Sequence, residues 1–449
     1  MEKRKYQENC SLDVRRALIK YKRVLLNLPT GAGKTVIATD FVDRACLKNL
    51  VTIFVADRVE LIEQTFKHFN KAGISCQIID RNTKHIVKSN VYIAMVETLY
   101  RRISSEWFNI HFDLLILDEC HMGNYNKLME LTVIREKMII GLTATPIAAS
   151  KQYPLNKNFE EIITGPSVPW LIENKYLVKS IDIGQNKLLD LKVQSGEFTP
   201  ESQITQFSKN NLDNKMIELW KKHAIDRQTI VFNINLDHND KIVKLFESFG
   251  IDVIGVSSKT EPEERAEIIS QYKSGRYQVL CNVGITTKGF DSPETSCIVV
   301  NRSTASLSLW YQMIGRGGRP FNGKYDFITI DMGNNLLFHG SYNDEIDWVS
   351  IFREDERDRS FRVKRKPKLC PICYAYIFNI HIKECPVCGR FLTTRDLLNM
   401  EDQMPKELKE KPIQEMNLKE LYTYAKYKGY KPGWAWVQFH QRQNKKTLV

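Results

Sequence analysis

The sequence predicts an α/β protein with two parallel-sheet lobes in tandem and a small cysteine-rich module near the C-terminal end. Short apolar runs alternate with amphipathic stretches in two separate parts of the chain, and this order is typical of parallel sheets covered by helices. Four cysteines in two C-x-x-C pairs follow the second part. The 449 residues suffice for two or three domains, each with its own core.

The first lobe is predicted from apolar runs that have the composition of buried strands. These runs are Val24–Asn27, Val51–Ala56, Cys76–Ile79, Val91–Met95, Leu114–Leu117 and Met138–Leu142. Between about residues 147 and 215 this rhythm is lost. Prolines and a polar stretch there predict a closing segment of the first lobe and then an irregular crossing.

A second group of apolar runs predicts the second lobe. Its members are Thr229–Phe232, Asp252–Val256, Val279–Cys281, Ile298–Val300 and Phe327–Ile330. We therefore expect a first lobe over residues 1–170, an inter-lobe segment over 171–215, a second lobe over 216–345 and an accessory region over 346–449, which contains the cysteine module at 370–388.

A phosphate-binding loop is predicted directly after the first strand run. Its sequence is Leu28-Pro29-Thr30-Gly31-Ala32-Gly33-Lys34-Thr35, and a helical pattern follows it. A strand, a glycine turn and a helix start aim backbone N–H groups at one point, which suits the phosphates of ATP. Lys34 would reach the β- and γ-phosphates, and the Thr35 hydroxyl would ligate Mg²⁺. Leu28 stands where the general pattern has glycine.

Two carboxylates complete the expected ATPase site. Asp118 and Glu119 follow the apolar run Leu114–Leu117. A carboxylate at the carboxyl end of a strand can hold Mg²⁺, directly or through water. Its neighbour faces the other way and can orient and deprotonate the attacking water. Phosphoryl transfer needs both tasks, so we expect Asp118 to hold the metal and Glu119 to act on the water.

Asp118-Glu119-Cys120-His121 resembles motif II of the superfamily 2 helicases, as a DECH variant of the DEAD/DEAH box. Further stretches resemble the other motifs in the family's order: Tyr6-Gln7 (glutamine motif), Val55-Ala56-Asp57-Arg58 (Ia), Ala94-Met95-Val96-Glu97-Thr98-Leu99 (the next nucleic-acid segment), Gly141-Leu142-Thr143-Ala144-Thr145-Pro146 (III), Ile230-Val231-Phe232 (IV), Thr286-Thr287-Lys288-Gly289-Phe290-Asp291 (V) and Gln312-Met313-Ile314-Gly315-Arg316-Gly317-Gly318-Arg319 (VI). The resemblance covers about residues 1–335 and implies two RecA-like lobes with ATP between them.

The resemblance also implies roles in ATP binding and hydrolysis. The catalytic group would comprise Lys34, Asp118, Glu119, Gln312, Arg316 and Arg319. Arg319 would be the arginine finger and Arg316 a second contact, because an arginine from the opposite lobe stabilises charge that develops during phosphoryl transfer. Besides the phosphate loop, the nucleotide would contact Gln7, Gly289 and Asp291.

Coupling to nucleic acid is implied for a further set of side chains. Thr143 and Thr145 would relay the nucleotide state. Hydroxyl and guanidinium groups suit contact with a phosphate backbone that does not depend on base sequence. The residues expected to line the nucleic-acid channel are Arg58, Thr98, Arg101 and Thr286.

The cysteine module is predicted to bind a structural metal ion. Cys370 and Cys373 form one C-x-x-C pair, Cys385 and Cys388 form the other, and eleven residues separate the pairs. Four thiolates in this pattern can close a tetrahedral Zn²⁺ site. An iron–sulfur cluster and disulfides are the alternatives. His381 and Cys120 are expected not to be ligands.

The rest of the C-terminal region is basic and aromatic. Arg362–Lys368 packs five cations into seven residues, and Tyr427–Trp436 interleaves aromatic residues with lysines. For these aromatics, stacking on exposed bases and packing against the lobes are both open. The zinc module together with this segment resembles bacterial RadD-like repair helicases and related phage helicases. That resemblance implies branched DNA substrates such as forks, D-loops and Holliday-type junctions.

Taken with a net charge of +12, which suits a polyanionic partner, these motifs predict an ATP-dependent DNA helicase or translocase that remodels branched DNA in replication, recombination or repair. An RNA helicase and a nucleotide-switched nucleic-acid clamp without unwinding activity are the alternatives. Single-stranded-DNA-binding or recombination proteins are candidate partners. We expect a monomer, because one chain supplies both halves of the ATPase cleft. We expect a cytoplasmic location with no membrane contact, because the sequence shows neither a secretory signal nor an apolar run of the ~20 residues that span a bilayer.

Overall fold

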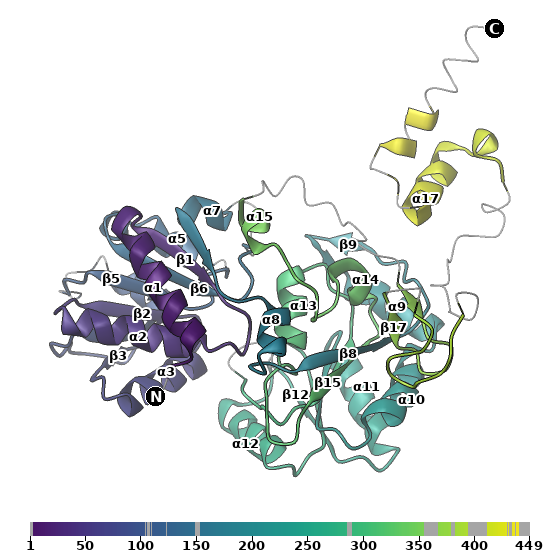
Figure 1. The fold of residues 1–449 in the computed structure, drawn as a ribbon, viewed down its shortest axis with the longest axis horizontal. Helices are drawn as coiled ribbons and strands as arrows, with labels where there is room; N and C mark the ends of the chain where they lie inside the picture. Colours follow the sequence, from purple (N-terminus) through teal and green to yellow (C-terminus); the bar gives the residue numbers. More distant parts are fainter. Residues whose placement is uncertain are drawn as a thin grey trace, which may run out of the picture.

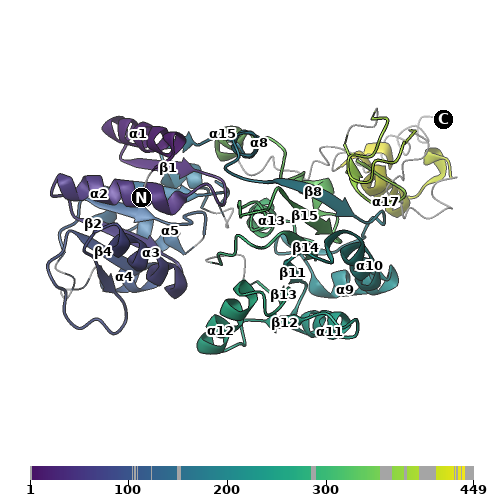
Figure 2. The same ribbon diagram turned by 60° about the horizontal axis from the view of Figure 1, so that its bottom comes forward.

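The computed structural model describes residues 3–103, 105, 108, 110–122, 124–148, 153–284, 290–353, 367–378, 382–393, 411–428, 430, 433–435 and 437–439. Two parallel sheets form two lobes that lie side by side (Figures 1 and 2). Helices cover both faces of each sheet, so the predicted fold class, two α/β lobes in tandem, is confirmed. Within the described ranges, no helix is both long and apolar enough to cross a membrane.

The first lobe contains a seven-stranded parallel sheet in the order β3-β4-β2-β5-β6-β1-β7. Its strands are β1 (Arg23–Asn27), β2 (Thr52–Ala56), β3 (Gln77–Ile79), β4 (Val91–Met95), β5 (Leu114–Leu117), β6 (Met138–Thr143) and β7 (Glu161–Thr164). Its helices are α1 (Lys5–Lys20), α2 (Lys34–Leu47), α3 (Val59–Lys71), α4 (Val96–Arg102), α5 (Tyr125–Met129), α6 (Thr132–Arg135), α7 (Leu155–Asn158) and α8 (Val168–Glu173). The central strands are buried on both faces, which explains their continuous apolar sequences.

The second lobe contains a six-stranded parallel sheet in the order β12-β13-β11-β14-β15-β8. Its strands are β8 (Lys179–Gly184), β11 (Thr229–Asn233), β12 (Val253–Val256), β13 (Val279–Asn282), β14 (Cys297–Asn301) and β15 (Asp326–Asp331). Its helices are α9 (Pro200–Lys209), α10 (Leu212–Ala224), α11 (Leu236–Glu247), α12 (Pro262–Lys273), α13 (Leu307–Ile314) and α14 (Asn335–His339). A short antiparallel pair, β9 (Val193–Gln194) and β10 (Glu197–Phe198), precedes α9.

All the strands expected from the apolar runs are present, but the two sheets each gain an edge strand that was not expected. The prediction of an irregular crossing was wrong for β8, which pairs with β15 over six residues. Hydropathy missed this strand because it buries polar side chains. Asp182 accepts hydrogen bonds from Ser180 at 2.6 Å and from Ser341 at 2.5 Å, so its burial is compensated.

The cysteine module packs against β8, the edge strand of the second sheet. It contains the antiparallel pair β16 (Lys368–Leu369) and β17 (Tyr376–Ile377). Ile183 bridges to Ala375, and the Gly184 N–H donates to the Tyr374 carbonyl at 3.1 Å. A Cβ at Gly184 would lie 2.2 Å from the Tyr376 ring, so only glycine permits this approach. The module therefore covers an edge that would otherwise offer unpaired backbone groups.

After the second lobe, the chain returns to the first. Helix α15 (Trp348–Arg353) lies beside α7 (Figure 1) and contacts β7. Phe352 is buried in the same apolar cluster as Leu155 and Phe159, and Arg353 lies 3.6 Å from Glu161. A segment from beyond the second lobe thus completes part of the first lobe's core.

The C-terminal unit, residues 411–439 as far as they are described, has a small core of its own. It contains a 3₁₀ turn (Ile413–Glu415) and α17 (Leu418–Lys428). Met416, Leu421, Ala425 and Ala435 are buried together, and Trp434 packs on this cluster. The basic residues 362–366, together with Gly429, Lys431, Pro432 and Trp436 of the aromatic segment, lie outside the described residues.

Candidate functional site

The phosphate loop lies between β1 and α2, as its sequence predicts. Gly31 and Gly33 have φ values of +84° and +89°, a region that disfavours residues with a Cβ. Lys34 is the first residue of α2, and its Nζ lies 3.5 Å from Glu119 Oε1. Leu28 is fully buried in the place of the usual glycine. A Cβ at Gly165 would lie 2.3 Å from Leu28 Cδ1, so the absence of a side chain at Gly165 leaves space for Leu28.

The two motif II carboxylates lie where β5 ends, opposite the phosphate loop. Glu119 has a φ of +46°, which turns the backbone and sends the two acids in different directions. Burial and then the nearby Glu119 carboxylate raise the pKa of Asp118 to about 7, whereas Lys34 lowers it. Such a concentration of carboxylate charge fits a divalent cation, since Mg²⁺ binds oxygen ligands and would stabilise the ionised form. The hydroxyl of Thr35, at the start of α2, is of the same ligand type.

A path of close polar contacts joins the motif II acids to the second lobe through His121. His121 Nδ1 lies 3.3 Å from Glu119 Oε2 and 2.9 Å from Thr143 Oγ1. Across the lobe boundary, His121 Nε2 lies 2.8 Å from Gln312 Nε2. Thr143 Oγ1 already donates to the Thr145 carbonyl, so His121 donates from Nδ1 and accepts the Gln312 amide proton at Nε2. The sequence analysis gave His121 no role, although it stands in motif II.

The expected coupling residue Thr145 also contacts the second lobe. Its Oγ1 lies 2.6 Å from Ser308 Oγ, which belongs to α13. Both threonines of the third motif therefore lie on a path from the acids to α13, the helix that carries Gln312.

One of the two motif VI arginines, Arg319, packs on the phosphate loop from the second lobe. A Cβ at Gly31 would lie only 3.1 Å from Arg319 Cγ, so this side chain packs directly on the loop. Arg319 forms an ion pair with Asp291, another residue expected to bind nucleotide. Arg316 is buried and donates to the Phe290 carbonyl at 2.5 Å. Burial lowers the pKa of Arg316 to about 10, and the Glu119 carboxylate acts in the opposite direction.

An aromatic cluster beside the phosphate loop was not foreseen. Tyr6 Oη and Gln7 Nε2 both donate to the Ala32 carbonyl, at 2.7 and 3.1 Å. The Tyr6 ring lies 5.0 Å from Tyr176 and 6.0 Å from Trp170, centroid to centroid. Trp170 is 40% exposed and therefore offers a face on which an adenine ring can stack. Trp170 and Tyr176 belong to none of the motifs, so the sequence did not indicate that they lie beside the phosphate loop.

Comparisons with known proteins agree with this geometry. Residues 1–148 match the family described as the res subunit of type III restriction enzymes, and residues 210–320 match the helicase conserved C-terminal domain. The chain belongs to the superfamily 2 helicases. As a member, it is an ATP-hydrolysing enzyme with two RecA-like lobes.

Several relatives of this helicase span most of its length. A 51.5 kDa protein of a Lactococcus phage (isolate 7-9) is 26% identical over 434 residues, covering 94% of this chain and 89% of the phage protein. IRC3 of Saccharomyces cerevisiae, named as an ATP-dependent helicase, is 28% identical and covers 74% of this chain, which spans about half (53%) of IRC3. XPB2 of Sulfurisphaera tokodaii, named a DNA 3'-5' translocase, is 25% identical. The match covers 67% of this chain and 76% of XPB2.

Solved structures share the fold at lower sequence identity. A fragment of an HsdR-type subunit of a type I restriction enzyme from Vibrio vulnificus YJ016 has a TM-score of 0.58 and 21% identity, and covers 80% of this helicase and 67% of the fragment. The type ISP restriction-modification enzyme LlaBIII, solved bound to DNA, has a TM-score of 0.57 and 12% identity, and covers 74% of this helicase and 28% of LlaBIII.

The residues expected to contact nucleic acid are only partly described. Arg58 precedes α3 as its N-cap, and Thr98 and Arg101 lie on α4. These helices begin at the carboxyl ends of β2 and β4, which are neighbours in the first sheet, so the structure brings the three residues to one edge. Thr286, and Gly289 of the expected nucleotide contacts, lie outside the described residues.

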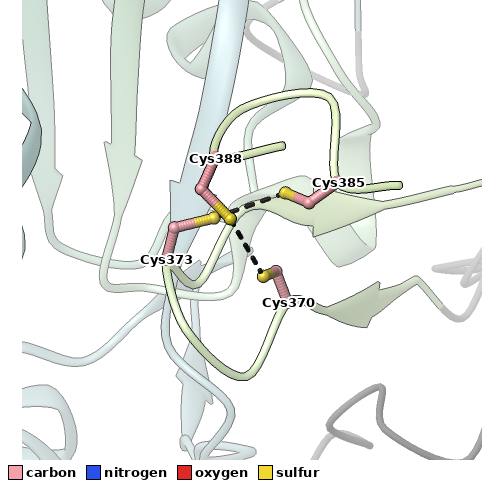
Figure 3. A group of neighbouring side chains, drawn as sticks. All are labelled: Cys370, Cys373, Cys385 and Cys388. Atoms are coloured by element: carbon pink, nitrogen blue, oxygen red, sulfur yellow. Dashed lines mark hydrogen bonds between the residues drawn. The ribbon is translucent and has the colours of Figure 1, made fainter. Parts of the chain in front are cut away.

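The four cysteines of the module meet as a metal site requires. Their thiol groups point toward one another (Figure 3), and all four sulfurs lie within 4.8 Å of each other. Cys370 and Cys388 are 3.8 Å apart and Cys373 and Cys385 3.5 Å apart, sulfur to sulfur. Tetrahedral Zn–S bonds of about 2.3 Å give sulfur separations of about 3.8 Å, whereas a disulfide bond is about 2.05 Å long. The set therefore fits Zn²⁺. Cys120 is buried in the first lobe's core, and His381 lies outside the described residues.

Alanine at Trp170 is expected to raise the KM for ATP by about 2- to 12-fold, because an aromatic stacking contact contributes about 0.5–1.5 kcal/mol. The kcat should change little, since Trp170 lies away from the acids. Steady-state ATPase assays on Trp170→Ala and Trp170→Phe check this, and phenylalanine should keep most of the affinity. An unaltered KM in the alanine variant would place adenine elsewhere.

Proposed function

We propose that this chain is an ATP-dependent DNA helicase or translocase that remodels branched DNA. The observation that carries the proposal is the meeting of motif VI with the phosphate loop. Arg319 from the second lobe packs on Gly31, while Lys34 and Glu119 of the first lobe lie 3.5 Å apart. ATP bound at this boundary would contact both lobes, so its hydrolysis would change how they are held together.

Each part of the site then has a separate task. Lys34 and the loop N–H groups bind the phosphates, and Asp118 with Thr35 would hold Mg²⁺, which neutralises phosphate charge when bound. Glu119 accepts a proton from the attacking water. Arg319 stabilises the charge that develops on the γ-phosphate, with Arg316 nearby.

The path of polar contacts from Glu119 through His121 to Gln312 supports coupling between chemistry and movement. It passes from the catalytic base to α13 through buried side chains. A change in the charge of Glu119 or in the lobe spacing would alter the His121–Gln312 contact. A second contact, between Thr145 and Ser308, reaches the same helix, α13.

DNA as the substrate is supported by charge and by relatives. The chain carries a net charge of +12, which favours a polyanion. XPB2 is named a DNA translocase, and LlaBIII was solved on DNA. Branched DNA rests on the likeness of the C-terminal region to RadD-like helicases. We further propose that the four cysteines hold Zn²⁺.

ATP-dependent processing of a substrate panel tests the proposal. The panel contains a replication fork, a Holliday junction, a flapped duplex and an RNA duplex, each with and without ATP. We expect processing of the branched DNAs and a several-fold rise in ATPase rate with DNA. Activity confined to the RNA duplex would make the chain an RNA helicase. DNA-stimulated ATPase without strand or triplex displacement would make it a nucleotide-switched clamp.

A further inference from the structure

The C-terminal unit is a folded element that the ATPase cycle leaves unexplained. Its core is held by ring contacts, with Trp434 lying 4.5 Å from Tyr430 and stacked on Tyr424 at 6.2 Å, centroid to centroid. Backbone hydrogen bonds close the turn after α17, since the Tyr430 N–H donates to the Ala425 carbonyl at 3.0 Å. The unit therefore fixes its aromatic residues in position before any ligand binds.

Two of these tyrosines remain open to solvent although they are large and partly apolar. Tyr422 is 48% exposed and Tyr430 is 42% exposed. Tyrosine rings held on a folded element lose little conformational entropy when a planar partner stacks on them, because only two side-chain torsions are free. Such rings form the platforms on which unpaired bases stack.

The sequence that contains these tyrosines is strongly basic. From Leu418 to the end of the sequence there are seven basic residues and one acid, Glu420; the basic residues are Lys419, Lys426, Lys428, Lys431, Arg442, Lys445 and Lys446. Glu420 is engaged inside the unit, where it pairs with Lys411 at 2.8 Å and accepts the Asn417 N–H at 2.8 Å. This excess of positive charge in the sequence suits an external polyanion.

We propose that the C-terminal unit is a second DNA site, which binds single-stranded DNA by stacking bases on Tyr422 and Tyr430, with the basic sequence of this region attracting the phosphate backbone. Unpaired DNA is favoured over duplex because base faces are accessible only outside a duplex stack. The inference rests on DNA being the substrate proposed above, and it adds a site outside the two lobes. Held there, an unpaired arm of a branched substrate would stay near the motor.

Binding of a fluorescent 20-nucleotide oligo-dT to the full chain without nucleotide tests this site. Stacking contributes about 1–3 kcal/mol per base, so Tyr422→Ala should raise Kd about fivefold or more, and Tyr422→Ala/Tyr430→Ala should raise it further. Phenylalanine at both positions should keep binding near the wild-type level. Tyr325→Ala is the matched control, because that tyrosine is 86% exposed but lies in the second lobe.

ATPase assays locate the effect. At saturating oligo-dT the alanine variants should keep the wild-type rate, and only the DNA concentration for half-maximal stimulation should rise. Wild-type oligo-dT affinity in the double alanine variant would overturn the proposal. An equal loss of oligo-dT affinity in the double phenylalanine variant would also overturn it. So would oligo-U RNA that binds the wild-type chain more tightly than oligo-dT does and loses the same affinity in the alanine variants. If DNA fails to stimulate the wild-type ATPase yet the tyrosine variants lose oligo-dT binding, the motor function fails and the second site stands.

Discussion

Alanine at Arg319 is expected to lower the kcat for ATP by about 10³-fold or more, while the Kd for ATP changes little. An arginine finger acts on charge that develops only in the transition state, so its removal affects turnover far more than binding. The structure supports Arg319 over Arg316 for this role, because Arg319 packs on Gly31 and its partner is Asp291, whereas Arg316 is engaged with the Phe290 carbonyl.

Steady-state ATPase assays and titration with a fluorescent ATP analogue check the two quantities separately. Arg276→Ala is the matched control, because this arginine is also in the second lobe but is exposed and lies 3.7 Å from Asp252 at the surface. Arg319→Lys should restore little, since lysine lacks the planar fork of donors. Normal turnover in Arg319→Ala would remove this residue from the site, and a parallel loss of ATP binding would indicate a ground-state role instead.

Serine at Cys388 is expected to weaken binding of the proposed zinc ion and to destabilise the second lobe. Cys388 is the exposed member of the four, so its replacement removes a ligand without opening a buried cavity. A loss of about 3 kcal/mol would lower Tm by roughly 6–12 °C in a lobe of this size. Chelation of the wild-type protein should have the same effect.

The lobe itself should respond because the module is joined to it at several points. His223 Nε2 lies 2.8 Å from the Cys373 carbonyl, and Lys222 donates to the Ile372 carbonyl at 2.7 Å. Elemental analysis and thermal unfolding measure zinc content and Tm, with Cys46→Ser as a control in the first lobe. A chain that binds no metal as purified, or a Cys388→Ser variant with wild-type Tm, would contradict this prediction.

The sequence predicted those features that depend on local pattern. Continuous apolar runs marked every central strand, because strands buried on both faces tolerate few polar residues. It missed β8, whose buried Asp182 is satisfied by hydroxyl donors from the strand itself and from Ser341, far away in the sequence. A buried carboxylate whose hydrogen-bond donor is distant in the sequence cannot be recognised from the residues next to it.

In the site, too, residues within motifs could be predicted from the sequence, whereas contacts between distant residues could not. Motif spacing indicated Lys34, Asp118 and Glu119, but whether they meet is decided by the fold. His121 was passed over because its role depends on Gln312, which lies 191 positions away. Trp170 and Tyr176 were missed for the same reason, since only folding brings them to Tyr6.

The return of α15 to the first lobe limits how the protein can be shortened. A fragment cut after the last strand of the second sheet would retain every helicase motif, yet it would lack Phe352, which is buried among first-lobe residues. Such a fragment would leave an uncovered apolar site next to β7. Extending the fragment through Arg353 should restore this piece of the first lobe's core, while the edge of β8 would stay uncovered until the cysteine module is also included.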